Sequence, residues 1–111
     1  MSYAEIAEMI AALGLPWAYY QFRDGTGIAP PFVAYYYPVS DDFFADDKNY
    51  QKIRDLIIEL YTDEKDFALE ATVENALMDA GLTYARDEAD IDTERMHMVT
   101  YTAQVAITEE S

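Results

Sequence analysis

Apolar residues recur along the chain with two different spacings, and the change between them divides the sequence into predicted helices and strands. Residues 2–13 have the helical spacing: a capping-box pair, Ser2 and Glu5, stands at the start, and Gly14 and Pro16 follow the end. The apolar positions form one stripe, so we expect this helix to pack one side against a sheet. The stripe consists of Ile6, Met9, Ile10 and Leu13.

Two aromatic-rich segments, residues 17–22 and 32–38, are separated by turn-forming residues that include Gly25 and Gly27. This composition predicts two strands joined as an antiparallel hairpin with a long connection. Tyrosines occupy successive positions in both strands, so rings are expected on both faces. Such a strand lies either at the centre of a sheet or partly in an interface between subunits. The tyrosines are Tyr19, Tyr20, Tyr35, Tyr36 and Tyr37.

Residues 50–62 fit both periodicities. Strand alternation places Leu56, Ile58 and Leu60 on one face. Because β-branched and aromatic residues dominate the second half of the segment, we predict a strand. The helical alternative is met in part by Ile53, Leu56, Ile57 and Leu60.

A second predicted helix follows this strand. Asp63 is its expected N-cap, Glu64 and Asp66 lie in its first turn, and Gly81 ends it. The spacing of its apolar residues predicts a single buried stripe, as in the first predicted helix. The stripe consists of Leu69, Val73, Ala76, Leu77 and Ala80.

Two strands complete the prediction: a short one over 82–87 and, after a turn near 90–94, a long one over 95–107. The order α-β-β-β-α-β-β predicts an α+β fold, in which an antiparallel sheet packs against two helices. No linker interrupts the pattern, so a single domain is expected to span residues 1–111. One face of the closing strand is largely apolar and consists of His97, Val99, Tyr101, Ala103, Val105 and Ile107.

The composition narrows the classes of function. The 111 residues include 22 acidic and 7 basic ones, a net charge of −15, which argues against binding to nucleic acid or to an anionic membrane. The chain has no cysteine, which excludes a disulfide scaffold and a thiolate metal site. No apolar run reaches the roughly 18 residues of a membrane span, and the N-terminus lacks a basic signal-peptide start. We therefore expect a soluble, cytoplasmic domain.

No residue pattern predicts catalysis. None of the serines, Ser2, Ser40 and Ser111, stands in a nucleophile-elbow motif, and the Gly-Thr-Gly turn lacks the rest of a phosphate-binding loop. The single histidine, His97, is expected to be a structural residue on an apolar strand face. We predict that the protein is not an enzyme and uses no cofactor or metal. The acidic pairs lack the EF-hand spacing and are Asp41 with Asp42, Asp46 with Asp47, and Asp90 with Asp92.

Several segments occur in a characteristic order, namely residues 3–10, 15–22, 29–32, 35–38, 58–67 and 99–102. In this order they resemble a family of small tail-completion or tail-terminator proteins from bacteriophages with long flexible tails. The resemblance extends over nearly the whole chain, and its most specific part is residues 59–67, Glu-Leu-Tyr-Thr-Asp-Glu-Lys-Asp-Phe. None of the segments is a chemical motif, so their order carries the resemblance.

The resemblance implies a virion protein of α+β fold that forms a homo-oligomeric ring, commonly sixfold, at the head-proximal end of the tail. Such a ring terminates the tail tube and joins it to the head. The implied partners are other copies of the chain, the major tail tube protein and a head-completion or connector protein, with assembly in the host cytoplasm. DNA would pass through the ring without specific binding, because carboxylates repel phosphates.

Within a ring, some residues are candidates for subunit contacts and others for the channel. Two phenylalanines in an acidic loop, Phe43 and Phe44, and a basic cluster of Lys48, Lys52 and Arg54 are the interface candidates. Acids that follow residue 40 are the channel candidates. They are the loop acids Asp41, Asp42, Asp46 and Asp47 and the turn acids Asp87, Glu88, Asp90 and Asp92.

The charge also fits other functions. A small, strongly acidic phage protein can mimic DNA and inhibit a host DNA-binding protein by occupying its DNA site. A third alternative is a globular domain whose charge only ensures solubility. These alternatives differ in native mass, because a ring is much heavier than a monomer or a dimer bound to a basic host protein.

Overall fold

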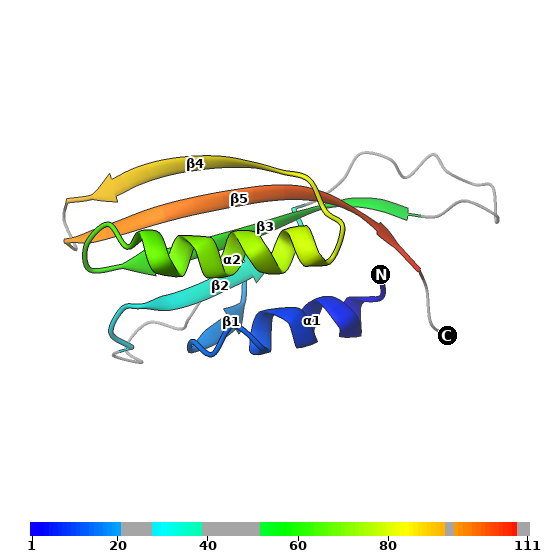
Figure 1. The fold of residues 1–111 in the computed structure, drawn as a ribbon, viewed down its shortest axis with the longest axis horizontal. Helices are drawn as coiled ribbons and strands as arrows, with labels where there is room; N and C mark the ends of the chain where they lie inside the picture. The colour runs from blue at the N-terminus through cyan, green and yellow to red at the C-terminus, as the bar shows by residue number, and fades with distance from the viewer. Residues whose placement is uncertain (21–27, 39–51, 93–94, 109–111) are drawn as a thin grey trace.

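The computed structural model describes residues 1–20, 28–38, 52–92 and 95–108. These residues contain two helices and five strands in the predicted order (Figure 1). Among them, no helix is long and apolar enough to cross a membrane. The elements are α1 (Tyr3–Ala11), β1 (Trp17–Tyr19), β2 (Phe32–Tyr36), β3 (Lys52–Thr62), α2 (Phe67–Asp79), β4 (Tyr84–Ile91) and β5 (Met96–Ile107).

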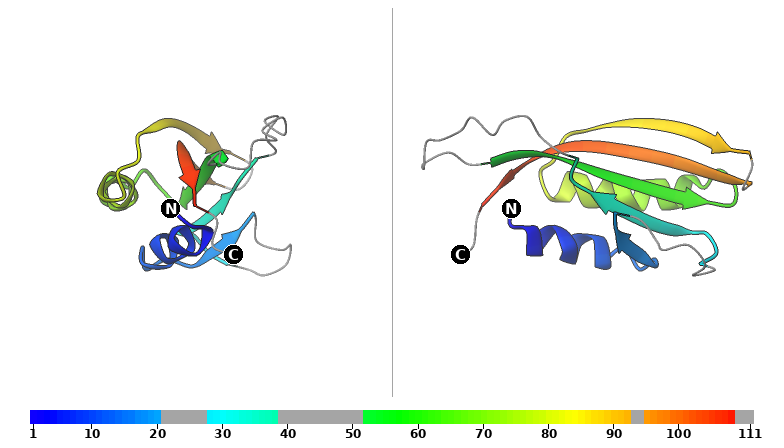
Figure 2. Two further views of the ribbon diagram at one scale, coloured as in Figure 1. Left: turned by 90° about the vertical axis from the view of Figure 1, so that its right-hand side faces the viewer. Right: turned by 180° about the vertical axis from the view of Figure 1, so that it is seen from behind.

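The strands form one sheet in the order β1-β2-β3-β5-β4, and both helices lie on the same face of it (Figures 1 and 2). This arrangement confirms the predicted α+β fold. The core lies between the sheet and the helices, where alternating residues of β3 and β5 meet the apolar stripes of α1 and α2. Its fully buried side chains include Ile6, Ile10, Leu56, Ile58, Leu60, Val73, Leu77, Val99, Tyr101 and Val105.

The predicted antiparallel hairpin is wrong, because β1 pairs with β2 in parallel and the sheet is mixed. The other three strand pairs are antiparallel. Tyr20 has a positive φ of 78°, and its N–H donates to the Tyr35 carbonyl at 2.6 Å, which ends β1. A parallel pair needs a connection of about a dozen residues, and residues 20–31 supply that length.

The segment with two possible periodicities forms strand β3, as predicted. It pairs with β2 on one side and with β5 on the other, so it lies at the centre of the sheet. Leu56, Ile58 and Leu60 are completely or almost completely buried against the helices. Two-sided pairing gives every second residue of β3 a place in the core, which the helical alternative would not do.

The ends of the helices follow local capping chemistry. The Ser2 hydroxyl accepts a hydrogen bond from the Glu5 N–H at 3.1 Å, and the Ser2 N–H donates to the Glu5 carboxylate at 2.8 Å, so the capping box is confirmed. The predicted N-cap Asp63 is wrong: the Asp66 carboxylate accepts from the Leu69 N–H at 3.0 Å and starts α2 three residues later. Asp63 precedes this start, in the bend after β3.

Strand β4 is longer than predicted and starts later. It pairs with β5 from Tyr84 opposite Ala103 to Ile91 opposite Met96. Asp87, Glu88 and Asp90 therefore lie in a strand, whereas Asp92 lies in the turn. The reason is tertiary: hydrogen bonds from β5 outweigh the weak strand preference of acidic residues, which an exposed edge strand tolerates.

Candidate functional site

A pocket lined by four tyrosines and one arginine lies on the face of the sheet that the helices cover. The parallel register sets Tyr19 of β1 opposite Tyr35 of β2, and alternation carries Tyr37 to the same face. Tyr3 reaches the pocket from the first turn of α1, and Arg54 reaches it from β3. The pocket has a volume of about 330 Å³.

Three large rings stand exposed at this end of the sheet. Trp17, Tyr19 and Tyr20 are 42%, 52% and 64% exposed, and we call them the aromatic edge. The Tyr19 ring meets Tyr35 edge to face at 5.3 Å, and the Tyr20 ring stacks on Tyr36 at 5.5 Å. Each such pair contributes about 0.5–1.5 kcal/mol beyond burial. The rings are therefore held by neighbours and still accessible.

Two hydrogen-bond donors in the pocket wall have no acceptor among the residues that the structure describes. The Tyr37 hydroxyl and the Arg54 Nε are both buried without a hydrogen-bond partner. Burial raises the pKa of Tyr37, and the nearby Tyr35 and Tyr3 raise it further, so the hydroxyl keeps its proton. In the part of the chain that the structure describes, Arg54 makes no hydrogen bond or ion pair. Buried polar groups without partners are rare and destabilising, and they call for an explanation.

A second polar feature, the charged cluster, lies between α2 and the paired strands β4 and β5. Its centre is Glu70, which is only 3% exposed and accepts hydrogen bonds from Lys65 at 2.9 Å and from Arg86 at 2.7 Å. Arg86 also contacts two further carboxylates at 2.7 Å each. A buried carboxylate needs such paired cations. The cluster consists of Lys65, Glu70, Glu74, Arg86, Glu88, Asp90 and His97.

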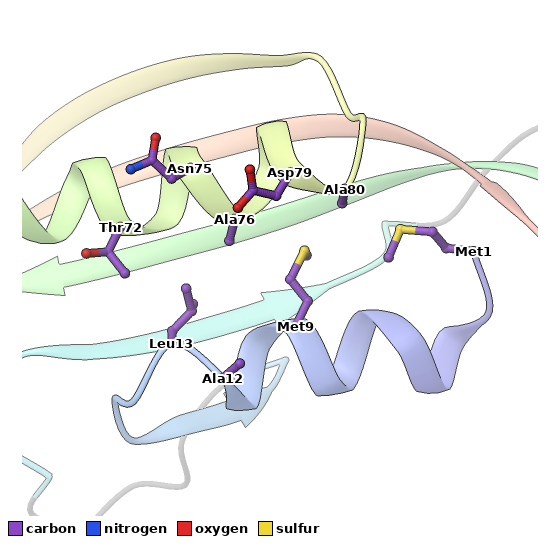
Figure 3. Close-up of a pocket in the computed structure, with 9 residues that line it drawn as sticks. All are labelled: Met1, Met9, Ala12, Leu13, Thr72, Asn75, Ala76, Asp79 and Ala80. Carbon is purple, nitrogen blue, oxygen red and sulfur yellow. The ribbon is translucent and has the colours of Figure 1, made fainter.

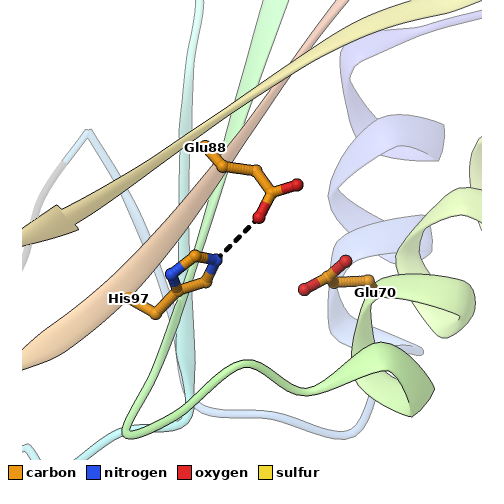
Figure 4. A group of neighbouring side chains, drawn as sticks. All are labelled: Glu70, Glu88 and His97. Carbon is orange, nitrogen blue, oxygen red and sulfur yellow. Dashed lines mark hydrogen bonds and ion pairs between the residues drawn. The ribbon is translucent and has the colours of Figure 1, made fainter.

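His97 lies in this cluster between two carboxylates of β4. Its Nε2 is 3.0 Å from Glu88, the contact drawn in Figure 4, and its Nδ1 is 2.7 Å from Asp90. The hydrogen bond from Lys65 lowers the pKa of Glu88 to about 2, against a smaller opposing effect of burial, and Arg86 and His97 lower it as well. The sequence predicted that this histidine lies on an apolar strand face. In the structure, His97 lies at the start of that face and contacts the carboxylates of Glu88 and Asp90.

Glu70, Glu88 and His97 offer three ligand atoms within 4.8 Å of one another, a spacing that could hold a metal ion. However, the Lys65 ammonium already lies 2.9 Å from Glu70 and 2.7 Å from Glu88, where a cation would bind. Arg86 contacts the same two carboxylates. The cluster's own cations thus contact Glu70 Oε1 and both oxygens of Glu88, although the buried Glu70 Oε2 has no hydrogen-bond partner among the described residues. We interpret the cluster as an ion network that attaches β4 to α2.

The two helices leave a hollow of about 520 Å³ between them, lined partly by apolar side chains. Met9 of α1 and Leu13, which follows the end of α1, lie on one side, and Ala76 and Asp79 of α2 line the opposite side (Figure 3). Met9 and Leu13 are also packed against the core.

The structure places only part of the predicted interface and channel residues. Arg54 lies in the pocket wall, and Lys52 begins β3. Asp87, Glu88, Asp90 and Asp92 are all exposed, and Glu88 and Asp90 also contact His97. Seven other candidates lie outside the described residues: Phe43, Phe44, Lys48, Asp41, Asp42, Asp46 and Asp47.

Sequence reasoning missed both the charged cluster and the unpartnered pocket donors. One signal was present: Glu70 occupies the same helical face as Val73 and Leu77, three and seven positions further on. A glutamate within an apolar stripe indicates a buried ion pair. Its partner Arg86 could not be identified, because the pair depends on how β4 lies against α2.

Comparison with known proteins leaves the chain without an assigned relative. No model of a known protein family matches it. No curated protein and no solved structure gives a significant match either. The aromatic edge, the pocket and the charged cluster are therefore the basis for a functional proposal.

Proposed function

We propose that this protein is a structural subunit of a bacteriophage with a long tail. Its copies form a homo-oligomeric ring at the head-proximal end of that tail, and the ring is sixfold, as is common in the family that the sequence resembles. It terminates the tail tube, joins it to the head-completion or connector protein, and has no enzymatic activity. The observation that carries the proposal is the aromatic edge of three exposed rings. One of them, Tyr19, lines the pocket of Arg54, whose Nε has no hydrogen-bond partner among the described residues. The order of segments that resembles tail-terminator proteins supports the same role.

The two edges of the sheet favour a head-to-tail assembly. The β1 edge carries Trp17 and Tyr19, whereas the β4 edge carries Asp87, Glu88 and Asp90. Large exposed aromatic residues mark interfaces, and an acidic edge repels a copy of itself. A contact between two different surfaces of the same subunit is heterologous, and repeated contacts of this kind form a ring when the rotation from one subunit to the next closes.

The net charge of −15 suits a channel for DNA. Carboxylates that face the channel repel the phosphate backbone, so that DNA passes without binding. We assign the channel to acids that follow residue 40, which include the exposed Asp87, Glu88, Asp90 and Asp92. In this role the protein belongs to the virion, and its ring assembles in the host cytoplasm.

Native mass spectrometry and negative-stain microscopy test this proposal, with the protein alone and with purified tail tubes. We expect a closed ring that caps the tubes. A Trp17→Ser, Tyr20→Ser variant should not assemble, whereas Met78→Ser, which changes another exposed apolar residue, should assemble normally. A monomer or dimer that binds a basic host protein and never forms a ring would contradict the proposal and favour the DNA-mimic alternative.

A further inference from the structure

We propose that the pocket around Arg54 binds a carboxylate, and that this carboxylate belongs to an acidic side chain of a second copy of the chain. The inference rests on the proposed ring and names a contact within it. It follows from the donors in the pocket wall, from the tyrosine rings around them and from the distribution of charge over the chain.

The pocket offers hydrogen-bond donors that lack an acceptor. Arg54 and Tyr37 supply them, and both side chains line the same pocket of about 330 Å³. A carboxylate accepts hydrogen bonds from a guanidinium in a paired geometry and from a hydroxyl at the same time. The small volume suits a single side chain, since it lies near the lower end of the range for ligand pockets.

The rings around Arg54 strengthen such a contact. The ring centroids of Tyr3 and Tyr37 are 5.1 Å apart in an edge-to-face arrangement, and those of Tyr19 and Tyr37 are 6.0 Å apart. The pocket wall is therefore largely aromatic. An ion pair surrounded by apolar atoms is screened less by water than one on an open surface. Arg54 is therefore better placed to hold a carboxylate than an exposed lysine would be.

The distribution of charge favours a second copy as the source of the carboxylate. Lys65 and Arg86 are already paired with carboxylates of their own chain, whereas Arg54 has no such pair within the described ranges. A strongly acidic protein repels polyanions such as DNA, but each copy presents single carboxylates. Exposed acids without a side-chain partner among the described residues are Glu8, Asp55, Asp63, Glu64, Asp79, Asp87 and Asp92.

Zero-length carbodiimide cross-linking of an Arg54→Lys variant tests the contact directly, because it joins an amine to a carboxylate that touches it. The variant is prepared with and without ¹⁵N, the two forms are mixed, and linked peptides are identified by mass spectrometry. We expect links from position 54 to an acidic residue that pair a labelled with an unlabelled peptide. Arg95→Lys is the matched control, since Arg95 is exposed and lies outside the pocket.

A second measurement uses Arg54→Gln. A hydrogen-bonded ion contributes about 1.5–3 kcal/mol, so the variant should need roughly 10–100 times more protein to assemble. Thermal unfolding of the monomer should be unchanged or slightly raised, because an unpartnered buried donor is removed. Assembly equal to that of Arg95→Gln would overturn the inference, as would links from position 54 only within one chain.

The outcomes separate this inference from the proposed function. A ring that forms without labelled-to-unlabelled links at position 54 leaves the proposed function intact and refutes the pocket contact. Links between copies in a protein that never closes into a ring support the contact and refute the ring. The absence of both refutes both.

Discussion

Replacing Arg86 with methionine should destabilise the fold more than any other change of a surface cation that the structure describes. Its guanidinium contacts Glu70, Glu74 and Glu88 at 2.7 Å each, and thereby connects β4 to α2. Methionine keeps much of the aliphatic stem and removes the charge. The change therefore leaves the packing of the stem largely in place and removes the ion network together with the contact of the guanidinium with the Tyr101 ring, 6.0 Å from the ring centroid.

The magnitude follows from the exposure of each partner. The contact with Glu70, which is 3% exposed, is a hydrogen bond to a buried charge, and it contributes about 1.5–3 kcal/mol. Glu74 and Glu88 are more exposed, so their pairs add less than the pair with Glu70 does. Lys65 still holds Glu70, which keeps the loss below that of a completely unpaired buried charge. We expect a loss of about 3 kcal/mol.

Urea unfolding followed by far-ultraviolet circular dichroism measures this loss. At this chain length, about 3 kcal/mol corresponds to a decrease in Tm of roughly 12 °C. Arg95→Met is the control, because Arg95 is exposed, and it should change stability by less than about 0.5 kcal/mol. A Glu70→Gln variant and the double variant complete a mutant cycle. If Arg86→Met loses no more stability than Arg95→Met, the ion network does not hold β4 in place.

Three further predictions concern pH, assembly and the channel. The folded-state pKa of Glu88 is lowered to about 2, so the contribution of this carboxylate to stability is complete above about pH 4.5 and is lost as the pH falls toward 2. In unfolding experiments over this pH range, the stability of Glu88→Gln should therefore fall less with acid than that of the unchanged protein. Replacing Phe43 and Phe44 with serine should prevent ring formation in native mass spectra and leave monomer melting nearly unchanged; a collapse of melting would instead place both rings in the core. Asp87→Lys with Asp92→Lys should create salt-sensitive binding to duplex DNA in the assembled ring, measured by fluorescence anisotropy, and no binding at any salt concentration would remove these acids from the channel.

Local features of the fold could be predicted from the sequence, because residues close along the chain determine them. The Ser2–Glu5 capping box needs only groups within one helical turn. Gly81 ends the second helix because its φ of 79° is easy only for glycine. Alternation in β3 and β5 predicted which residues are buried, since successive strand residues point to opposite faces. The order of elements followed from these local patterns.

Features that depend on distant residues were decided only by the tertiary structure. The sequence could not show that β1 pairs with β2 in parallel, because the connection permits either direction. The length of β4 depends on its pairing with β5 at the edge of the sheet, and the pairing of Glu70 with Arg86 requires α2 to lie on the same face as the Arg86 side chain. From the sequence, the basic cluster of Lys48, Lys52 and Arg54 predicted only a subunit interface. The absence of an acceptor at Arg54 became visible only when β3, β2 and α1 enclosed it, because hydrogen-bond satisfaction depends on every group within reach.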